Sequence, residues 1–113
     1  MNAMTDAQQR LEDKRENMFA PGNPILVDHS RVLRGKKYMD GLKVGDRVHF
    51  RREFVHSWDP TAVAVLREDG LKIGYLDCHL SADMASDINK RIVYAAEFVA
   101  PTSERGHSLF RML

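Results

Sequence analysis

Apolar and polar side chains alternate along several short stretches of this chain, the pattern of β-strands that bury one face. In 45–53, Val48 and Phe50 alternate with arginine and histidine residues. The stretch 91–101 alternates again and places four residues on one predicted face: Ile92, Tyr94, Ala96 and Phe98. Residues 107–113 predict a final strand with two different sides, Phe110 with Met112 and Leu109 with Leu113.

A hairpin is predicted in the middle of the chain. Within 61–76, two arms rich in apolar and β-branched residues flank Glu68, Asp69 and Gly70. An Asp-Gly pair supplies the positive backbone φ that tight hairpin turns require. A short apolar run at 25–27 adds an earlier strand, so the chain has β character from that point onward.

An amphipathic helix is predicted directly after the hairpin. In 79–91, three apolar residues recur at every fourth position and therefore share one face: Leu80, Met84 and Ile88. Either Asp77 or Ser81 can cap the start of this helix. Several short strands with one such helix predict a mainly β fold, a small OB- or SH3-like antiparallel β-barrel that hides its strand edges by closure.

A proline- and glycine-containing cluster at 20–24 marks a boundary. We expect residues 1–22 to be a polar, weakly ordered segment of helix-forming composition and residues 23–113 to form the barrel domain. No apolar run approaches the roughly 20 residues that span a bilayer, and the first residues lack the apolar middle of a signal peptide. These features predict a cytoplasmic protein without a membrane partner.

The net charge of +1 argues against a protein that binds through bulk charge, but the charges are unevenly distributed. Basic residues strongly outnumber acidic ones between Arg31 and Arg52, and the sign reverses from Glu53 to Asp87. A basic block on a nearly neutral domain is one way to bind phosphates. The alternative is a solvated face whose charges pair with the acidic half of the chain.

The residue types used in catalysis are present without the spacing that catalysis requires. Cys78 is the single cysteine, so the chain has neither an internal disulfide nor a thiolate zinc site. Cys78 and His79 are neighbours, and neighbouring side chains on a helix diverge by about 100°. The histidines show no HxH or HExxH spacing, and no phosphate-binding glycine motif occurs. We therefore expect no enzyme activity, no metal and no cofactor.

Two aromatic residues stand among polar or basic residues in predicted connections. Lys37 precedes Tyr38 in the stretch GKKYMDG (35–41), and Trp58 directly precedes Asp59. Exposed rings beside cationic groups hold single-stranded nucleic acid by stacking on its bases. Alternatively, both rings cover the barrel mouth as part of the core, and Asp59 forms an Asx-type turn.

Several motifs follow one another between Lys37 and Asn89: Lys37-Tyr38-Met39-Asp40-Gly41, Arg52-Glu53, His56 to Val63, Ile73-Gly74-Tyr75-Leu76, and a helix at 79–89. In this order they resemble a HIRAN domain, a small barrel found at the N-terminus of some Swi/Snf-type DNA translocases and alone in bacterial proteins. The family writes the third motif as Asn-Pro-Tyr-Asp-x-Asn-Ala-Ile/Val. This chain keeps the aromatic–Asp pair and the Ala-Val, but neither asparagine nor the first proline.

The resemblance implies recognition of single-stranded DNA, in particular of a free 3′ end. Carried over to the matching positions, Trp58 and Tyr38 would stack on terminal bases, and Lys37 would contact a phosphate. Asp59 would accept a hydrogen bond from the 3′-hydroxyl group. A carboxylate in that position also repels a terminal phosphate, which makes it selective for hydroxyl ends.

The resemblance assigns further contacts less directly. His56 takes the place of a base-contacting asparagine, and Tyr75 the place of a polar aromatic on the hairpin. Cys78 stands where the family often has a basic residue, and Arg51 and Arg52 are candidates to replace that phosphate contact, although the strand pattern lets at most one of them face the groove. Phe110 is the nearest match to a late aromatic in the family's groove.

The alternative function is a protein-interaction or regulatory domain that binds no nucleic acid. It requires an exposed apolar patch, for which the candidates are Met39, Met84, Phe110 and Met112. The expected partner is single-stranded DNA, with other nucleic acids and a protein partner in DNA repair or replication left open. A DNA-binding function would place the protein with the nucleoid.

Overall fold

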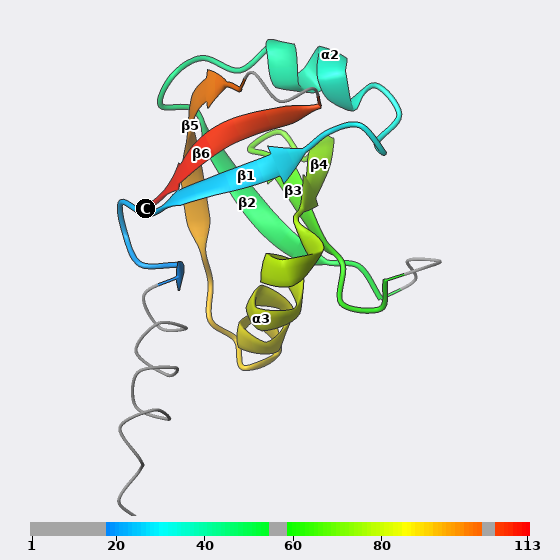
Figure 1. The fold of residues 1–113 in the computed structure, drawn as a ribbon, viewed down its shortest axis with the longest axis vertical. Helices are drawn as coiled ribbons and strands as arrows, with labels where there is room; N and C mark the ends of the chain where they lie inside the picture. Colours follow the sequence, from blue (N-terminus) through cyan, green and yellow to red (C-terminus); the bar gives the residue numbers. More distant parts are fainter. Residues whose placement is uncertain (1–17, 55–58, 103–105) are drawn as a thin grey trace, which may run out of the picture.

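The computed structural model describes residues 18–54, 59–102 and 106–113. Within these ranges, six strands pair antiparallel in the order β1-β4-β3-β2-β5-β6, and pairing of β6 with β1 closes the barrel (Figure 1). The prediction of a small, closed, mainly β antiparallel barrel is therefore confirmed.

The strands and helices lie close to where the pattern of the sequence predicted them. The strands are β1 (Pro24–Asp28), β2 (Arg47–Arg52), β3 (Val63–Arg67), β4 (Lys72–Leu76), β5 (Ala95–Pro101) and β6 (His107–Met112). The helices are α2 (Gly35–Asp40) and α3 (Cys78–Asn89), which lie at opposite ends of the barrel (Figure 1). The stretch 35–41, expected to be an open connection, is thus mostly a short helix. Ile92, expected on a buried strand face, precedes β5 and is exposed.

The predicted hairpin is the pair β3 and β4, with Gly70 at φ +88° in its turn. Arg67 and Gly70 close this turn through a backbone hydrogen bond of 2.9 Å. Glycine occupies this left-handed region without the steric cost that a Cβ would bring. The Asp-Gly pair therefore identified both the turn and the two strands, β3 and β4, that it connects.

The core fills the inside of the barrel with the residues of the alternating pattern that point inward. Phe98 and Phe110 meet there edge to face, with ring centroids 5.5 Å apart. All four members of the expected apolar patch are buried, with relative exposures of 3% or less: Met39, Met84, Phe110 and Met112. The expectation of an exposed patch was wrong, because Phe110 and Met112 on β6 point into the barrel, and Met39 on α2 and Met84 on α3 pack into the same core.

Helix α3 begins as the sequence predicted, with Asp77 as its cap. The Asp77 carboxylate accepts a hydrogen bond of 2.8 Å from the backbone N–H of His79. Met84 is fully buried, while Leu80 and Ile88 pack partly buried against the core. The apolar face of α3 thus covers one end of the barrel.

The chain just before β1 is already part of the packed body. Phe19 is 3% exposed, and its ring centroid lies 5.3 Å from that of Tyr94. Gly22 donates a backbone hydrogen bond of 2.7 Å to Met112. Most of the segment expected to be weakly ordered, 1–17, lies outside the described residues. Among those described, no helix is long and apolar enough to cross a membrane.

Gly74 allows β1 and β4 to approach each other closely. A Cβ at Gly74 would overlap the Asp28 carbonyl oxygen and lie 2.9 Å from Val27 Cγ1. The absence of a side chain lets Asp28 pair with Tyr75 in the β1–β4 ladder. This register brings the ends of the two strands together beside the start of α3.

Candidate functional site

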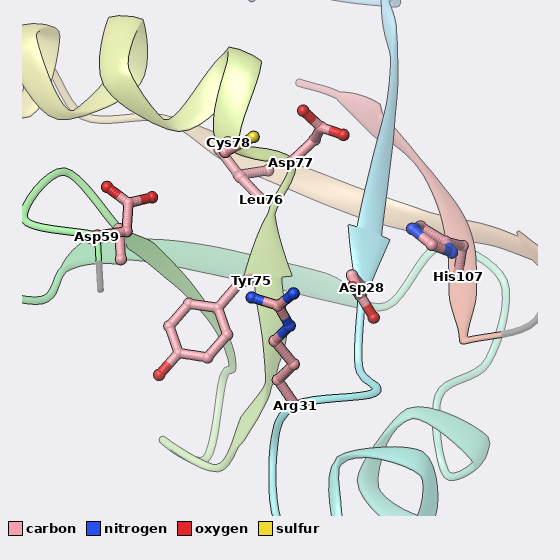
Figure 2. Close-up of a pocket in the computed structure, with 9 residues that line it drawn as sticks. Asp28, Arg31, Asp59, Tyr75, Leu76, Asp77, Cys78 and His107 are labelled. Atoms are coloured by element: carbon pink, nitrogen blue, oxygen red, sulfur yellow. The ribbon is translucent and has the colours of Figure 1, made fainter. Parts of the chain in front are cut away.

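A pocket of about 420 Å³ lies where β1 and β4 end and α3 begins. Its lining comes from several separate segments: Asp28, Arg31, Asp59, Ala62, Tyr75, Leu76, Asp77, Cys78 and His107 (Figure 2). Two residues that the resemblance assigned to a binding site, Asp59 and Tyr75, are thereby brought to one place. The other lining residues add charged and polar groups around these two.

The Asp59 carboxylate is held by the turn that follows it. Its Oδ1 accepts two hydrogen bonds of 2.8 Å from Thr61, one from the backbone N–H and one from the hydroxyl. Its Oδ2 lies 3.5 Å from the hydroxyl of Ser81, which is fully buried on α3. Asp59 is therefore the Asx-turn former that the sequence offered as an alternative, and it lines the pocket as well.

The Tyr75 side chain is held by a network of charged groups. Its hydroxyl donates to Glu53 Oε2 at 2.8 Å and lies 3.0 Å from the Lys72 ammonium group, which donates to it. Lys72 also donates to Glu53 Oε1 at 2.8 Å. With its hydroxyl end fixed, the Tyr75 side chain lines the pocket, as the Arg31 side chain does (Figure 2).

The charges in this network stabilise each other. Partial burial by itself raises the pKa of Glu53, but hydrogen bonds from Lys72 and Tyr75 and the charges of Lys72 and Arg51 outweigh it. The pKa of Glu53 therefore lies below its ordinary value of 4.5. For Lys72, burial alone lowers the pKa, but bonds to Glu53 and Tyr75 raise it above 10.5. Glu53 is thus ionised at neutral pH, and it orients Tyr75.

The pocket is also lined by Arg31, Asp28 and His107 (Figure 2). Burial raises the pKa of Asp28, whereas hydrogen bonds from Ser30 and the charges of His107 and Arg31 lower it by more. Arg31 was not among the predicted site residues. The signal that pointed to it was weak, because it was only the first member of the basic block. Its place in the pocket depends on the turn that follows β1.

Lys37 and Tyr38 lie on α2, and neither is among the residues that line this pocket. Lys37 is exposed, whereas Tyr38 is half-buried and packs against the core. The Tyr38 carbonyl accepts a hydrogen bond of 3.3 Å from Arg67. Within the described residues, the structure does not bring this expected pair together with Asp59.

Neither Arg52 nor Phe110 lines this pocket, and both make contacts within the folded barrel. Arg52 donates to the Asn89 side chain at 2.6 Å and to the Pro60 carbonyl at 3.4 Å, which ties β2 to the end of α3. Its guanidinium also lies 4.6 Å from the centre of the Phe54 ring. Phe110 is 0% exposed, so the expectation that its ring lines a groove was wrong. A ring enclosed on all sides has no face to offer a ligand.

The remaining two predicted residues, His56 and Trp58, lie outside the described residues, which resume at Asp59. Their assignments remain expectations from the resemblance.

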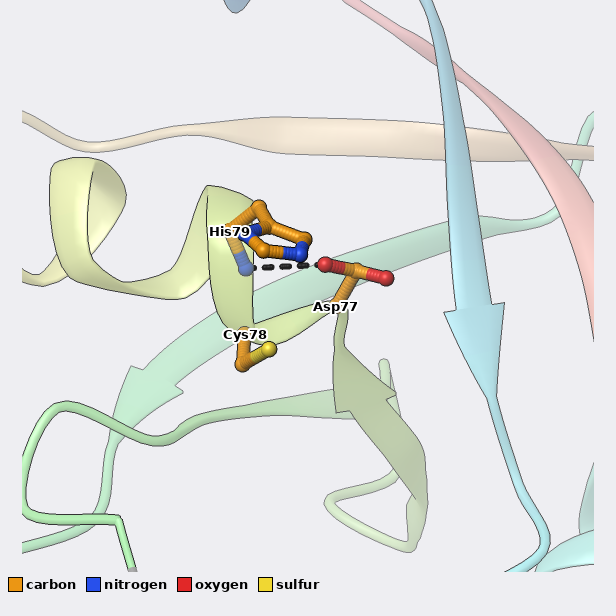
Figure 3. Close-up of side chains that lie close together, drawn as sticks. All are labelled: Asp77, Cys78 and His79. Atoms are coloured by element: carbon orange, nitrogen blue, oxygen red, sulfur yellow. Dashed lines mark hydrogen bonds between the residues drawn. The ribbon is translucent and has the colours of Figure 1, made fainter.

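Asp77, Cys78 and His79 form a small exposed cluster at the start of α3 (Figure 3). Their potential ligand atoms lie within 4.8 Å of one another. Capping of the helix accounts for this proximity, since the Asp77 carboxylate is bonded to the His79 backbone. The cluster therefore needs no bound ion to explain its geometry.

Comparisons with known proteins agree with this architecture. A family model described as the HIRAN domain matches residues 29–110. A crystal structure of a Lactobacillus plantarum protein is similar with a TM-score of 0.65 and 19% identity, over 79% of this chain and 90% of that one. The HIRAN domain of human HLTF is similar with a TM-score of 0.64 and 18% identity, over 81% and 73%. No curated protein matches. At these identities the structural likeness shows the fold alone.

Proposed function

The chain belongs to the HIRAN-domain family, and on that basis we propose that it is a nucleic-acid-binding module that recognises the free 3′ end of single-stranded DNA. The observation that supports this function most is the pocket shared by Tyr75, Arg31 and Asp59. It combines a flat ring, a cationic group and a carboxylate, which are the chemistries of base stacking, phosphate binding and hydroxyl recognition.

Each group has a distinct task in this proposal. The terminal base stacks on the Tyr75 ring, whose position is set by Glu53 and Lys72. The Arg31 guanidinium binds the adjoining phosphate. Asp59 accepts a hydrogen bond from the 3′-hydroxyl, and its negative charge disfavours a 3′-phosphate in the same position.

Trp58 directly precedes Asp59 in the sequence and is proposed as a second stacking ring. Each stacked base contributes about 1–3 kcal/mol. Because Trp58 is the single tryptophan, its fluorescence reports contact with a base without any label. We expect quenching when single-stranded DNA is added at low salt. A flat titration, with no change in fluorescence, would contradict this role for Trp58.

The decisive test compares two short oligonucleotides that differ only at the 3′ end, one with a hydroxyl and one with a phosphate. Fluorescence anisotropy with a 5′ label should show tighter binding of the hydroxyl form. Asp59→Asn should abolish this preference, because the amide carries no charge to repel the phosphate and keeps the turn to Thr61. Equal affinity of the unchanged protein for both ends would rule out end recognition.

Asp69→Asn is a matched control for this substitution. Asp69 is also a turn aspartate, whose carboxylate accepts a hydrogen bond of 3.2 Å from the backbone of Leu71. It lies in the β3–β4 turn and does not line the pocket. The control variant should retain the full preference for the hydroxyl end.

A further inference from the structure

A second and larger pocket, of about 730 Å³, adjoins the first. It lies between the chain leading into α2 and the facing ends of β5 and β6, and its lining is His29, Ser30, Val32, Arg34, Gly35, Lys36, Asp40, Pro101, Thr102, Gly106, His107 and Ser108. His107 lines both pockets. A ligand too long for the first pocket can therefore continue past His107 into the second.

The charged groups of the second pocket favour an anion. Arg34 and Lys36 supply positive charge, and the acidic residue in the lining, Asp40, already pairs with Lys36 at 3.0 Å. Arg34 has neither a hydrogen bond nor an ion pair from its side chain to another described residue. Its guanidinium is therefore available to a ligand, and its planar donors match the oxygens of a phosphate.

Arg34 also has an unusual backbone. Its φ of 62° and ψ of 11° place it in the left-handed region, which costs free energy for any residue with a Cβ. The next residue, Gly35, packs so tightly that a Cβ would lie 2.8 Å from the carbonyl oxygens of His29 and Ile73, so the turn at Arg34 is fixed against its neighbours. From this backbone conformation, Arg34 lines the second pocket with a cationic side chain.

Arg91 shares this backbone conformation for a different reason. Its φ is 66°, and it follows the end of α3, where its N–H donates to Ile88 at 2.9 Å. Ile92 in turn donates to Asp87 at 3.0 Å. This is the common way in which a helix ends. Arg91 is therefore a close match for Arg34 in residue type, backbone and exposure, but it lines neither pocket.

We infer that the strand whose 3′ end occupies the first pocket runs past His107 into the second, where Arg34 binds one of its phosphates. This inference rests on the proposed function, because it extends the same strand. The first pocket selects the end, and the second adds affinity that depends on length and salt but not on base sequence.

The test measures binding of a dinucleotide, a tetranucleotide and a hexanucleotide, all with a 3′-hydroxyl, to the unchanged protein and to Arg34→Gly and Arg91→Gly. The unchanged protein should bind the longer strands more tightly. Arg34→Gly should bind the dinucleotide normally but lose roughly tenfold in affinity for the hexanucleotide. Its salt dependence should also flatten by about 0.7 in the slope of log K against log salt.

The control variants separate binding from folding. Both glycine substitutions relieve a positive φ, so neither should lower the melting temperature. Arg34→Asn removes the charge with a residue that tolerates this conformation, and it should repeat the loss if Arg34→Gly unfolds. Equal affinities of the Arg34 and Arg91 variants for the hexanucleotide would overturn the inference.

The outcomes also distinguish the two proposals. If the unchanged protein binds the dinucleotide but gains nothing with length, the second pocket is not part of the path, and end recognition stands. If no oligonucleotide binds at any length, the proposed function itself fails.

Discussion

Replacing Glu53 with glutamine tests whether its charge holds Tyr75 in place. The substitution keeps the shape of the side chain but removes the negative charge that accepts from Lys72 and Tyr75, each at 2.8 Å. The amide also places a donor where two donors already converge. We therefore expect a lower free energy of unfolding of the barrel and a less fixed orientation of the Tyr75 ring.

The expected loss follows from the geometry and exposure of the network. A hydrogen bond to a charged group contributes about 1.5–3 kcal/mol in a protected site. The Glu53 side chain is 19% exposed, but Lys72 is 33% exposed, so solvent screens part of the attraction. We therefore expect Glu53→Gln to lower the free energy of unfolding by about 1–2 kcal/mol at neutral pH.

Urea unfolding followed by circular dichroism measures this loss, with Glu97→Gln as the control. Glu97 also pairs with a cation, Arg111, at 2.9 Å, but that partner is 51% exposed. Such surface pairs contribute about 0–1 kcal/mol. The Glu53 variant should therefore unfold at clearly lower urea than the Glu97 variant.

The stabilisation by Glu53 should depend on pH in a direction that its lowered pKa fixes. The pKa of Glu53 is lowered in the folded protein, so its contribution is present above pH 4.5 and is lost as the pH falls through the lowered pKa. The difference between the unchanged protein and Glu53→Gln should therefore shrink in acid. A difference that stays constant from neutral to acid pH, or one no larger than that of Glu97→Gln, would refute the role of the charge.

Two further predictions concern the frame of the site. Gly74→Ala should destabilise the barrel by about 1–3 kcal/mol or more, because the new Cβ overlaps the Asp28 carbonyl. Urea unfolding measures this loss, and an unchanged midpoint would show that β1 can move away from the new side chain. Burial, then the hydrogen bond and charge of Asp87, raise the pKa of Tyr94 to about 12, so its contribution to stability is complete below pH 10.0 and disappears as the pH rises through about 12. Ultraviolet titration should show this late phenol, Asp87→Asn should lower its pKa, and a titration unaffected by that substitution would contradict the assignment.

Local chemistry made much of the fold predictable from the sequence. The Asp-Gly pair identified the β3–β4 turn, and the fourfold spacing of Leu80, Met84 and Ile88 identified α3 with Asp77 as its cap. Strand alternation and helix periodicity depend on neighbouring residues, so they can be read without knowing the partners of each element.

The site was predictable only in part. Asp59 and Tyr75, two of the residues that the resemblance assigned, line one pocket, but Phe110 lies in the core, and Tyr38 on α2 packs against the core. Period-two alternation shows which side chains share a face, but only barrel closure decides which face points inward. An aromatic residue in a polar stretch can also pack against the core when that stretch forms a short helix, as Tyr38 does on α2.

The amino-acid sequence alone determined the strands, the hairpin and the capped helix, because each depends on residues close together along the chain, and it indicated the family through the order of its motifs. The tertiary structure alone decided that Arg31 and His107 line one pocket together with Asp59 and Tyr75. These residues meet because β1 pairs with both β4 and β6. Pairing between distant strands depends on the closure of the whole barrel, which no local pattern specifies.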